Sequence, residues 1–527
     1  MRLNISAWSI RTPMPACVAF IVLVILGIVS FRSLPLTKFP NIDIPIVQVR
    51  VTQSGAAPSE LESQVTKKIE DAVAGVNGIW HIISTVTDGS SITTIQFYVG
   101  STNVDRALND VKDEVAKIRS DLPRTIDEPI VNRLDIEGLP IVTYAASAPA
   151  MSVEDLSWFV DDTIARGLQS VKGVGSVTRN GGVDREIRVF LDPKKLLSLG
   201  VTAANVNAQL RATNVDLAGG RGEIAGQEQA IRTLAGARTV GDLAALPVWL
   251  PGGRKVRLDD LGSVTDGAAE ARSFARLDGR PIVAFGVSRA KGASDASVDA
   301  LVAQKIGELQ KQHPEVELTK VDTQVDNTIG NYRSAMETLI EGAILAILVV
   351  FLFLRDLRAT LVSAIALPLS AIPTFWAMDM LGFSLNLVSL LAITLVTGIL
   401  VDDAIVEIEN IVRHMRMGKS AYRAALEAAD EIGLAVIAIS MTIVAIFSPV
   451  SFMGGIAGQY FRQFGLTVAI AVLFSLLVAR LITPVVAAYF LRSHDEVARQ
   501  DGVVMRFYTR LVRGSVRHRW ITLGAGL

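Results

Sequence analysis

The chain of 527 residues is too long for one compact domain, because domains usually hold about 100–200 residues. Its mean hydropathy of +0.41 and its hydrophobic content of 50% are high for a soluble protein. The 51 Lys and Arg residues are balanced by 52 Asp and Glu, which excludes a nucleic-acid-binding protein or any other binder of a bulk polyion.

The first membrane helix is predicted after a short amphipathic segment, residues 1–12, that we place in the cytoplasm. Residues 13–31, PMPACVAFIVLVILGIVSF, form an uncharged run of nineteen, enough to cross about 30 Å of hydrocarbon as a helix. A signal peptide would have an apolar core of only about 7–15 residues and a small-residue cleavage site. The following SFRSLP does not resemble such a site, so we expect a retained transmembrane helix over 13–33.

Residues 34–135 have a soluble composition and a β-α-β-β-α-β pattern. IPIVQVRVTQS alternates like a strand, and SELESQVTKKIEDAVAGV places its apolar residues on one helical face. Asp88-Gly89 indicates a hairpin, and a second amphipathic helix at about 103–121 precedes the strand-like PIVNRL. This order is typical of a ferredoxin-like subdomain.

The same pattern recurs in residues 136–192 and 276–330, which predicts a duplicated subdomain. Five positions match at an offset of 95: Val65, Ile69, Val73, Val76 and Gly78 correspond to Val160, Ile164, Leu168, Val171 and Gly173. Residues 193–275 interrupt the second copy and contain the glycine-rich NVDLAGGRGEIAG. Because no GK[ST] sequence accompanies these glycines, we predict a projecting loop rather than a phosphate site.

Five further apolar runs predict transmembrane helices at 337–354, 359–378, 387–411, 432–453 and 464–490. Basic residues gather after the second, fourth and sixth helices: Arg355, Arg358, Arg413, Arg416, Lys419, Arg423, Arg492, Arg499, Arg506, Arg510, Arg513, Arg517 and Arg519. The opposite loops carry only Arg462. The excess of basic residues on one side therefore places both ends in the cytoplasm and the large domain outside it.

Residues 491–519 form a predicted cytoplasmic linker, whose basic amphipathic part should lie on the membrane surface. Residues 520–527 begin a seventh apolar run that is too short to span a bilayer, so we expect the chain to be part of a longer protein. The predicted fold class is an α+β membrane protein. It combines a six-helix transmembrane bundle and the start of a seventh helix with two ferredoxin-like subdomains and an insertion.

Asp402 and Asp403 stand side by side in the fourth predicted helix, after fifteen residues without charge. They point about 100° apart on a helix, so they cannot both face lipid without a large cost. Further polar and small residues extend them into one continuous stripe: Glu407, Glu409 and Asn410 toward the cytoplasmic end, and Thr394, Thr397 and Gly398 toward the other.

Arg480, in the sixth helix, is the candidate cationic partner that the predicted helices offer to this doublet. One arginine does not neutralise two aspartates, and carboxylates this close disfavour each other's ionisation. At least one carboxyl should therefore take up and release a proton, as intramembrane carboxylates in proton relays do. A structural ion pair that holds the bundle together is the alternative.

Several long motifs, in order along essentially the whole chain, resemble resistance–nodulation–division transporters of the hydrophobe/amphiphile efflux type. GILVDDAIVEIEN is similar to the fourth-helix motif of that family. The other motifs are SIRTPMPACVAF before the first helix, QSGAAPSELESQVTKKIEDAVAGVNGI and GVGSVTRNGGVDREIRVFLDP in the two subdomains, FSPVSFMGGIAGQYFRQFGLT between helices 5 and 6, and ITPVVAAYFL at the end of helix 6.

The resemblance implies a proton-driven exporter of the bacterial inner membrane that uses no ATP and no cofactor. Asp402 and Asp403 would be the proton-carrying pair, supported by Thr394, Glu407, Glu409, Asn410 and Arg480. Residues 34–135 and the second copy would be periplasmic porter subdomains, with Leu139 and Asn180 as candidate substrate contacts. Members work as trimers, here a homotrimer or a heterotrimer with a related permease, together with a periplasmic adaptor, an outer-membrane channel and membrane lipid.

The insertion at 193–275 would be the docking or funnel subdomain, and its loop with Asn214, Gly219 and Gly220 would reach into the next protomer. The resemblance also implies a partner lysine in a second half that would repeat the first, beyond residue 527. Two positions depart from the family pattern. Glu407 stands where an aliphatic residue is commoner, and Asn180 stands where well-known drug pumps carry a Phe.

Two alternative functions remain at this point. A metal-ion exporter of the same superfamily would have one acidic residue in this motif and soft ligands in the porter domain. This chain has two aspartates there, while Cys17 is its only cysteine and Met151 the only methionine between 34 and 334. The five histidines show no HxxxH or HExxH spacing, so we predict no metal site. The other alternative is a non-transporting receptor or secretion accessory protein, against which the porter-like repeats argue.

Overall fold

The computed structural model describes residues 5–42, 44–53, 55–100, 103–134, 138–214, 217–224, 227–233, 236–271, 273–492 and 503–526. The internal contacts of the chain divide it into two compact units. One comprises residues 1–34, 42–132 and 330–527, and the other comprises residues 35–41 and 133–329.

Six helices in the described residues are long and apolar enough to cross a membrane. They are α2 Pro13–Ser33, α13 Val325–Leu354, α14 Leu357–Met380, α15 Leu387–Arg416, the span Ala421–Phe452 and the span Gly455–Phe490. The fifth span consists of α16 Ala421–Phe447 and the 3₁₀ turn η5 Ser448–Phe452. The sixth consists of α17 Gly455–Leu477, the π-helical η6 Val478–Ile482 and α18 Thr483–Phe490. Shorter helices precede and follow them: α1 Ile5–Arg11, α19 Val503–Arg517 and α20 Arg519–Gly526.

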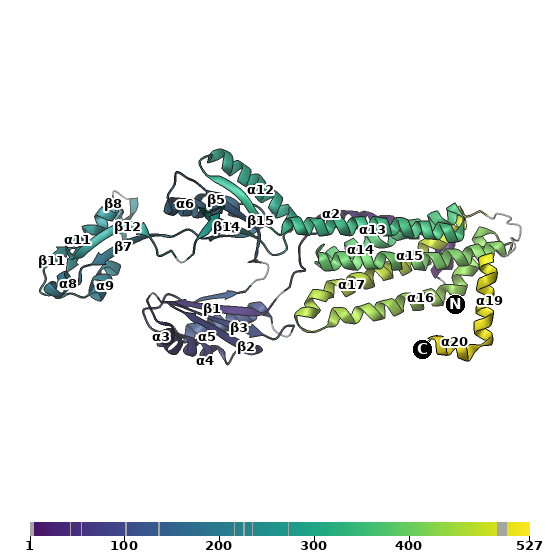
Figure 1. Ribbon diagram of the computed structural model, residues 1–527, viewed down its shortest axis with the longest axis horizontal. Helices are drawn as coiled ribbons and strands as arrows, with labels where there is room; N and C mark the ends of the chain where they lie inside the picture. Colours follow the sequence, from purple (N-terminus) through teal and green to yellow (C-terminus); the bar gives the residue numbers. More distant parts are fainter. Residues whose placement is uncertain are drawn as a thin grey trace. The chain divides into compact units, whose positions relative to one another are not determined.

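Helix α15 packs against α14, α16 and α17 (Figure 1), and its two ends are fixed by local sequence. At its N-terminus the Asn386 side chain accepts hydrogen bonds from the backbone N–H groups of Val388 and Ser389. The Asn386 amide also donates to Gln463 Oε1 of α17 at 2.6 Å. After its C-terminus Gly418 has φ 86°, a left-handed conformation that ends helices. These contacts set the register in which α15 presents its polar side chains.

Small residues let the helices approach closely. Ala424, Ala425, Ala428 and Ala429 of α16 are fully buried. A Cβ atom on Gly27 of α2 would lie 2.2 Å from the carbonyl oxygen of Ile372 in α14. Close backbone contact of this kind is a principal source of attraction between helices in lipid, where apolar burial adds little.

The first sheet has the strand order β2-β3-β1-β4, with β3 antiparallel to both of its neighbours. The elements in chain order are β1 Ile46–Thr52, α3 Pro58–Leu61, η1 Glu62–Thr66, α4 Lys67–Val73, β2 Ile79–Thr87, β3 Ser90–Phe97, α5 Val104–Lys117, η2 Arg119–Asp121 and β4 Ile130–Arg133. Alternate residues of β1 and β3 point into a core with one face of the helices. Asn103 caps α5 by accepting from two backbone N–H groups.

The second sheet repeats that order, because β6, β14, β5 and β15 correspond to β2, β3, β1 and β4. Its elements are β5 Pro140–Ser147, α6 Val153–Phe159, η4 Val160–Ala165, α7 Arg166–Gln169, β6 Val174–Asn180, β13 Ala275–Leu277, β14 Arg280–Arg289, α12 Asp295–Gln312 and β15 Glu317–Thr323. The matched apolar positions of the two helices, Val65, Ile69 and Val73 against Val160, Ile164 and Leu168, are all fully buried. Gly78 and Gly173 are both left-handed, at φ 83° and 90°.

The stretch between β6 and β13 forms a small module with its own core. It comprises β7 Arg185–Leu191, α8 Pro193–Leu199, α9 Ala203–Thr213, β8 Leu217–Ile224, β9 Gln227–Thr233, α10 Val240–Ala244, β10 Pro247–Trp249, β11 Lys255–Arg257, α11 Leu258–Leu261 and β12 Gly262–Ala268. Strand β7 pairs with β12 in a two-stranded sheet rather than with the second large sheet. It therefore joins the module, although it lies just before residue 193, where the sequence suggested that the insertion begins.

Residues 35–41, which follow α2, are held against the N-terminus of α12 by buried charges. Arg289 Nε lies 2.7 Å from Asp295 Oδ1, and the backbone N–H of Lys38 donates to Asp295 Oδ2 at 2.8 Å. Burial raises the pKa of the Asp295 carboxyl, while the Lys38 N–H and the Arg289 guanidinium lower it. Because both side chains of the ion pair are buried, each depends on the other for compensation of its charge.

Replacing Gly27 by Val should destabilise the bundle, because the new side chain would overlap the Ile372 carbonyl and push α2 away from α14. We expect a loss of about 1–3 kcal/mol, seen as a lower unfolding temperature of the detergent-solubilised protein. Gly342→Val in α13 is the control, since no described atom outside its own helix lies within 4 Å of the Cβ position there. Equal unfolding temperatures for the two variants would contradict the close α2–α14 packing.

Candidate functional site

Four polar side chains of α15 form a buried row. Asp403, Glu407, Asn410 and His414 follow one another at spacings of four, three and four residues, so they lie on one helical face. All four are buried, and Glu407 is completely inaccessible. Asp402 and Glu409 are exposed on the other side of the helix. The single polar stripe expected from the sequence is therefore wrong, because helical geometry separates it into a buried row and an exposed pair.

Asp403 is held by two hydroxyl groups from neighbouring helices. Ser475 Oγ of α17 donates to Asp403 Oδ2 at 2.9 Å, and Ser440 Oγ of α16 donates to the same atom at 3.3 Å. Each hydroxyl also lies near a backbone carbonyl, that of Leu400 at 3.2 Å for Ser475 and that of Val436 at 3.0 Å for Ser440. A hydroxyl has one hydrogen, so it can donate either to the carboxylate or to its carbonyl. Asp403 thus has partners that can adapt to either protonation state.

Glu407 faces Arg480, the buried arginine of the sixth membrane span. Arg480 Nη1 is 3.8 Å from Glu407 Oε2, and it donates a hydrogen bond to the Ala429 carbonyl of α16 at 2.7 Å. Within the residues that the structure describes, neither carboxylate oxygen of Glu407 has a hydrogen-bond partner. Arg480, expected as a candidate partner of the aspartate doublet, is therefore placed against Glu407 instead.

The π-helical segment η6 and a glycine of α16 position the Arg480 side chain. Arg480 is central in η6, which ends just before Thr483-Pro484. A π-helical turn accommodates a following proline that lacks an N–H, and such turns recur at functional sites. A Cβ atom on Gly433 would lie 2.5 Å from Arg480 Nη2. Gly433 therefore leaves the space that the guanidinium occupies.

The row ends at a cluster of charged groups around His414. His414 Nε2 lies 2.6 Å from Glu431 Oε2 of α16, and Arg413 Nη2 donates to Glu431 Oε1 at 2.6 Å. Lys419 Nζ lies 3.0 Å from His414 Nδ1 and also pairs with Glu427. An ammonium group can only donate, so Nδ1 must accept and the neutral ring must carry its hydrogen on Nε2. His414 thus donates to Glu431 in this arrangement.

The family model described as the AcrB/AcrD/AcrF family matches residues 5–526 of the chain. The chain belongs to the AcrB/AcrD/AcrF family. Its members are transporters of the resistance–nodulation–division superfamily and not enzymes. The six long apolar helices fit the membrane permease of such a transporter.

The other residues that the sequence singled out in this AcrB/AcrD/AcrF-family chain have separate surroundings. Asn410 belongs to the buried row and donates to the Ala428 carbonyl at 3.1 Å. Thr394 is half-buried and its hydroxyl donates to the Leu390 carbonyl of its own helix. Asn214 follows α9 and accepts from the Ala237 N–H at 2.7 Å. Gly219 and Gly220 lie in β8 at an irregularity of the β8–β9 pairing.

Leu139, which directly precedes β5, and Asn180, at the end of β6, are both exposed, and both of these strands pair with β14. A Cβ atom on Gly286 would lie 2.7 Å from Pro140 Cγ and 3.9 Å from Asn180 Nδ2. The Pro140 ring thus fills the space in which a side chain of residue 286 would lie, and the Asn180 amide lies beside it. The structure therefore brings these two sequence candidates to the same part of one sheet.

Sequence reasoning missed Ser440, Ser475, His414 and Glu431. A signal for His414 was present, since a spacing of eleven residues returns to the face of Asp403 on a helix. The two serines are isolated hydroxyls in apolar helices, a pattern that can equally stabilise the helix backbone. Only the packing of α16 and α17 on α15 shows that they meet Asp403.

The Glu407–Arg480 pair predicts strong coupling in a double-mutant cycle. Arg480→Met should leave a buried carboxylate without compensation and cost about 3–5 kcal/mol, whereas Glu407→Val with Arg480→Met should recover most of that loss. The measurement is the unfolding temperature of the single and double variants in detergent. Additive effects of the two single substitutions would show that the charges do not interact.

Proposed function

We propose that this chain is the permease part of a proton-driven exporter of hydrophobic or amphiphilic compounds in the bacterial inner membrane. The observation that carries the proposal is the environment of Asp403, a buried carboxyl with two adaptable hydroxyl partners in the middle of a membrane helix. Intramembrane carboxylates that lack a fixed cation commonly carry protons. The sheets would lie in the periplasm, and His414 at the cytoplasmic end of α15.

Protonation of Asp403 would change which groups bind to it. The carboxylate accepts from both serines, whereas a protonated carboxyl donates its own hydrogen and needs fewer donors. The serine hydroxyls can then turn toward the Leu400 and Val436 carbonyls, which lie within hydrogen-bond distance. Proton uptake would therefore loosen the contacts of α15 with α16 and α17 without leaving a buried hydroxyl unpaired. Helix movement of this kind would drive the conformational cycle of the porter subdomains.

The buried row provides a route for the proton toward the cytoplasm. Residues three and four apart on a helix have Cβ atoms about 5–6 Å apart, a gap that one bridging water can span between polar groups. Glu407 has two unpartnered oxygens among the described residues and follows Asp403 by one turn. Asn410 and His414 continue the row, and His414 contacts Glu431 of α16. Asp402, exposed beside Asp403, would complete the proton-carrying pair.

The proposed oligomer and its partner proteins are those of the family. Members generally form trimers with an adaptor and an outer-membrane channel, and we propose the same for this chain, as a homotrimer or with a related permease. The module from β7 to β12, which holds most of the predicted insertion 193–275, would be the docking subdomain, with Asn214, Gly219 and Gly220 in contact with the next protomer. Energy would come from the proton-motive force, without ATP or a cofactor.

The proposed substrate class is hydrophobic or amphiphilic compounds rather than metal ions. The surface beside Gly286 carries the Pro140 ring and the Asn180 amide, Leu139 precedes Pro140 in the chain, and soft metal ligands are scarce in the sequence around them. Leu139 would supply apolar contact and Asn180 a hydrogen bond. A substrate panel that includes amphiphilic dyes, detergents and divalent metal salts separates the two classes.

Asp403→Asn should abolish export and proton uptake, because an amide keeps the size of the side chain but cannot take up a proton. The measurement is substrate-dependent proton flux, followed with a pH-sensitive dye, in vesicles that hold the full-length protein. Glu409→Gln, which removes a carboxylate from the exposed side of the same helix, is the matched control and should keep its activity. Normal flux in Asp403→Asn would refute the relay.

His414→Gln should slow proton transfer at the cytoplasmic end, since glutamine can bond to Glu431 but cannot exchange a proton at neutral pH. We expect the flux to fall by at least about tenfold. His81→Gln, on a strand of the first sheet, is the control. An unchanged proton flux in His414→Gln would exclude His414 from the route while leaving the Asp403 result intact.

A further inference from the structure

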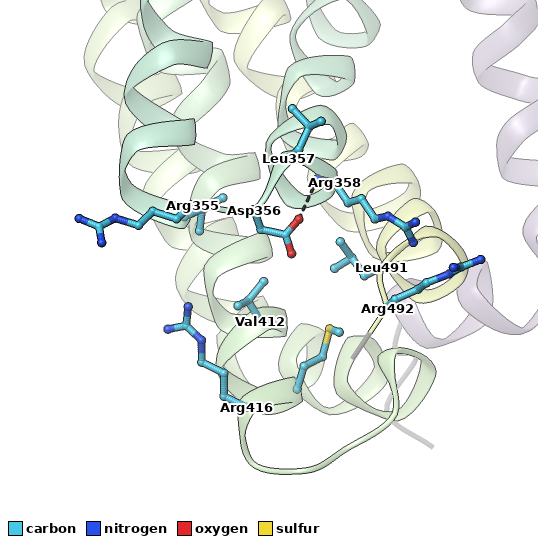
Figure 2. Close-up of a pocket in the computed structure, with 10 residues that line it drawn as sticks. Arg355, Asp356, Leu357, Arg358, Val412, Arg416, Leu491 and Arg492 are labelled. Carbon is cyan, nitrogen blue, oxygen red and sulfur yellow. Dashed lines mark hydrogen bonds between the residues drawn. The ribbon is translucent and has the colours of Figure 1, made fainter. Parts of the chain in front are cut away.

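A basic pocket lies at the corner between α13 and α14, apart from the buried row of α15. It has a volume of about 380 Å³ and is formed by three stretches of chain: residues 354–358, residues 412–416 of α15, and residues 491–492 after α18. Figure 2 shows that Arg358 and Arg492 extend on one side of it, and Arg355 and Arg416 on the other.

The charge of the pocket is strongly positive. Four arginines and one acid, Asp356, line it, which gives a formal charge of +3. Asp356 Oδ1 accepts from the backbone N–H groups of Arg358 at 2.8 Å and Ala359 at 3.3 Å, so this carboxylate is engaged in capping α14. An anion from outside the chain is therefore the ligand that the pocket best complements.

The rest of the lining is apolar and adjoins an exposed apolar stretch of α13. Leucine, valine and methionine side chains complete the pocket: Leu354, Leu357, Val412, Met415 and Leu491. Next to it on α13, Leu352 and Phe353 are 63% and 79% exposed. The pocket thus joins a positive site to an exposed apolar helix, which matches the two parts of a phospholipid.

We propose that this pocket binds the phosphate headgroup of an anionic phospholipid, with the acyl chains along α13. Arginine suits this ligand because its planar guanidinium binds phosphate oxygens in pairs, and basic pockets between membrane helices hold anionic headgroups. The chain's own basic helix α19 is a poor occupant, since it carries four arginines and no acid. The site lies at the end of the bundle to which His414 belongs, the side proposed to face the cytoplasmic leaflet.

The backbone at Arg355 supports a role for these arginines beyond connecting two helices. Arg355 has φ 51°, and Asp278 is the only other non-glycine residue with a positive φ among those described. A side chain with a Cβ atom is disfavoured in that conformation, which glycine adopts freely. An arginine at this corner therefore has a conformational cost that a glycine would not have. A role for its positive charge in ligand binding would account for its presence there.

Lipid titrations of the purified, delipidated protein in detergent test the site, with bound lipids counted by native mass spectrometry. Phosphatidylglycerol should bind more tightly than phosphatidylcholine with the same acyl chains. The double variant Arg358→Gln/Arg492→Gln should bind phosphatidylglycerol about thirtyfold more weakly. This factor is the combined effect of two basic residues, each making the usual contribution to binding of an anionic lipid. Asp356→Asn keeps the helix cap and should strengthen binding by about fivefold.

Asp379→Asn, the same substitution near the opposite end of α14, is the matched control and should bind phosphatidylglycerol as the wild type does. The opposite effects of the arginine and Asp356 variants cannot both arise from misfolding. Equal binding of the two lipids, or no change in the arginine variant, would overturn the proposal. Displacement of phosphatidylglycerol by millimolar glycerol 3-phosphate would overturn it in favour of a soluble phosphate ligand.

Discussion

Burial of carboxylates inside an apolar helix bundle is the constraint on which the membrane part of this protein depends. An ionised carboxylate in a low-dielectric interior costs several kcal/mol unless partners compensate for it. Each buried acid of α15 meets that requirement differently. Asp403 has two hydroxyls with alternative carbonyl acceptors, and Glu407 has a single guanidinium at 3.8 Å. The surroundings of Asp403 suit a carboxyl that takes up and releases a proton. Those of Glu407 keep the positive charge of Arg480 next to its carboxyl group.

These environments require close packing of particular residues. Arg480 reaches Glu407 because Gly433 leaves room for its guanidinium and because a π-helical turn precedes Pro484. Buried alanines bring α16 near enough for its carbonyls to bind Arg480 and Asn410. The alanines, Gly433 and the π-helical turn are therefore as necessary to the site as its charges. A larger side chain at Gly433 would disturb the site without touching any titratable group.

The architecture could largely be predicted from the pattern of apolar residues along the sequence. The side-chain partners in the candidate site could not. Apolar length predicted the six long helices, and the offset of 95 residues identified positions whose burial and glycine conformation agree in the two sheets. Spacing along α15 also pointed to Asp403, Glu407 and Asn410. Which helices meet that face depends on packing between distant segments, so Ser440, Ser475 and the Glu407–Arg480 pairing were missed. The division of the expected stripe into buried and exposed sides has the same cause.

The claim that Asp403 carries the proton can be tested most directly by infrared difference spectroscopy of the reconstituted protein during a pH change. The account predicts that acidification produces the carbonyl band of a protonated carboxylic acid, and that this band is lost in Asp403→Asn but kept in Glu409→Gln. A band of unchanged intensity in Asp403→Asn would contradict it, because the titrating carboxyl would then lie elsewhere in the protein.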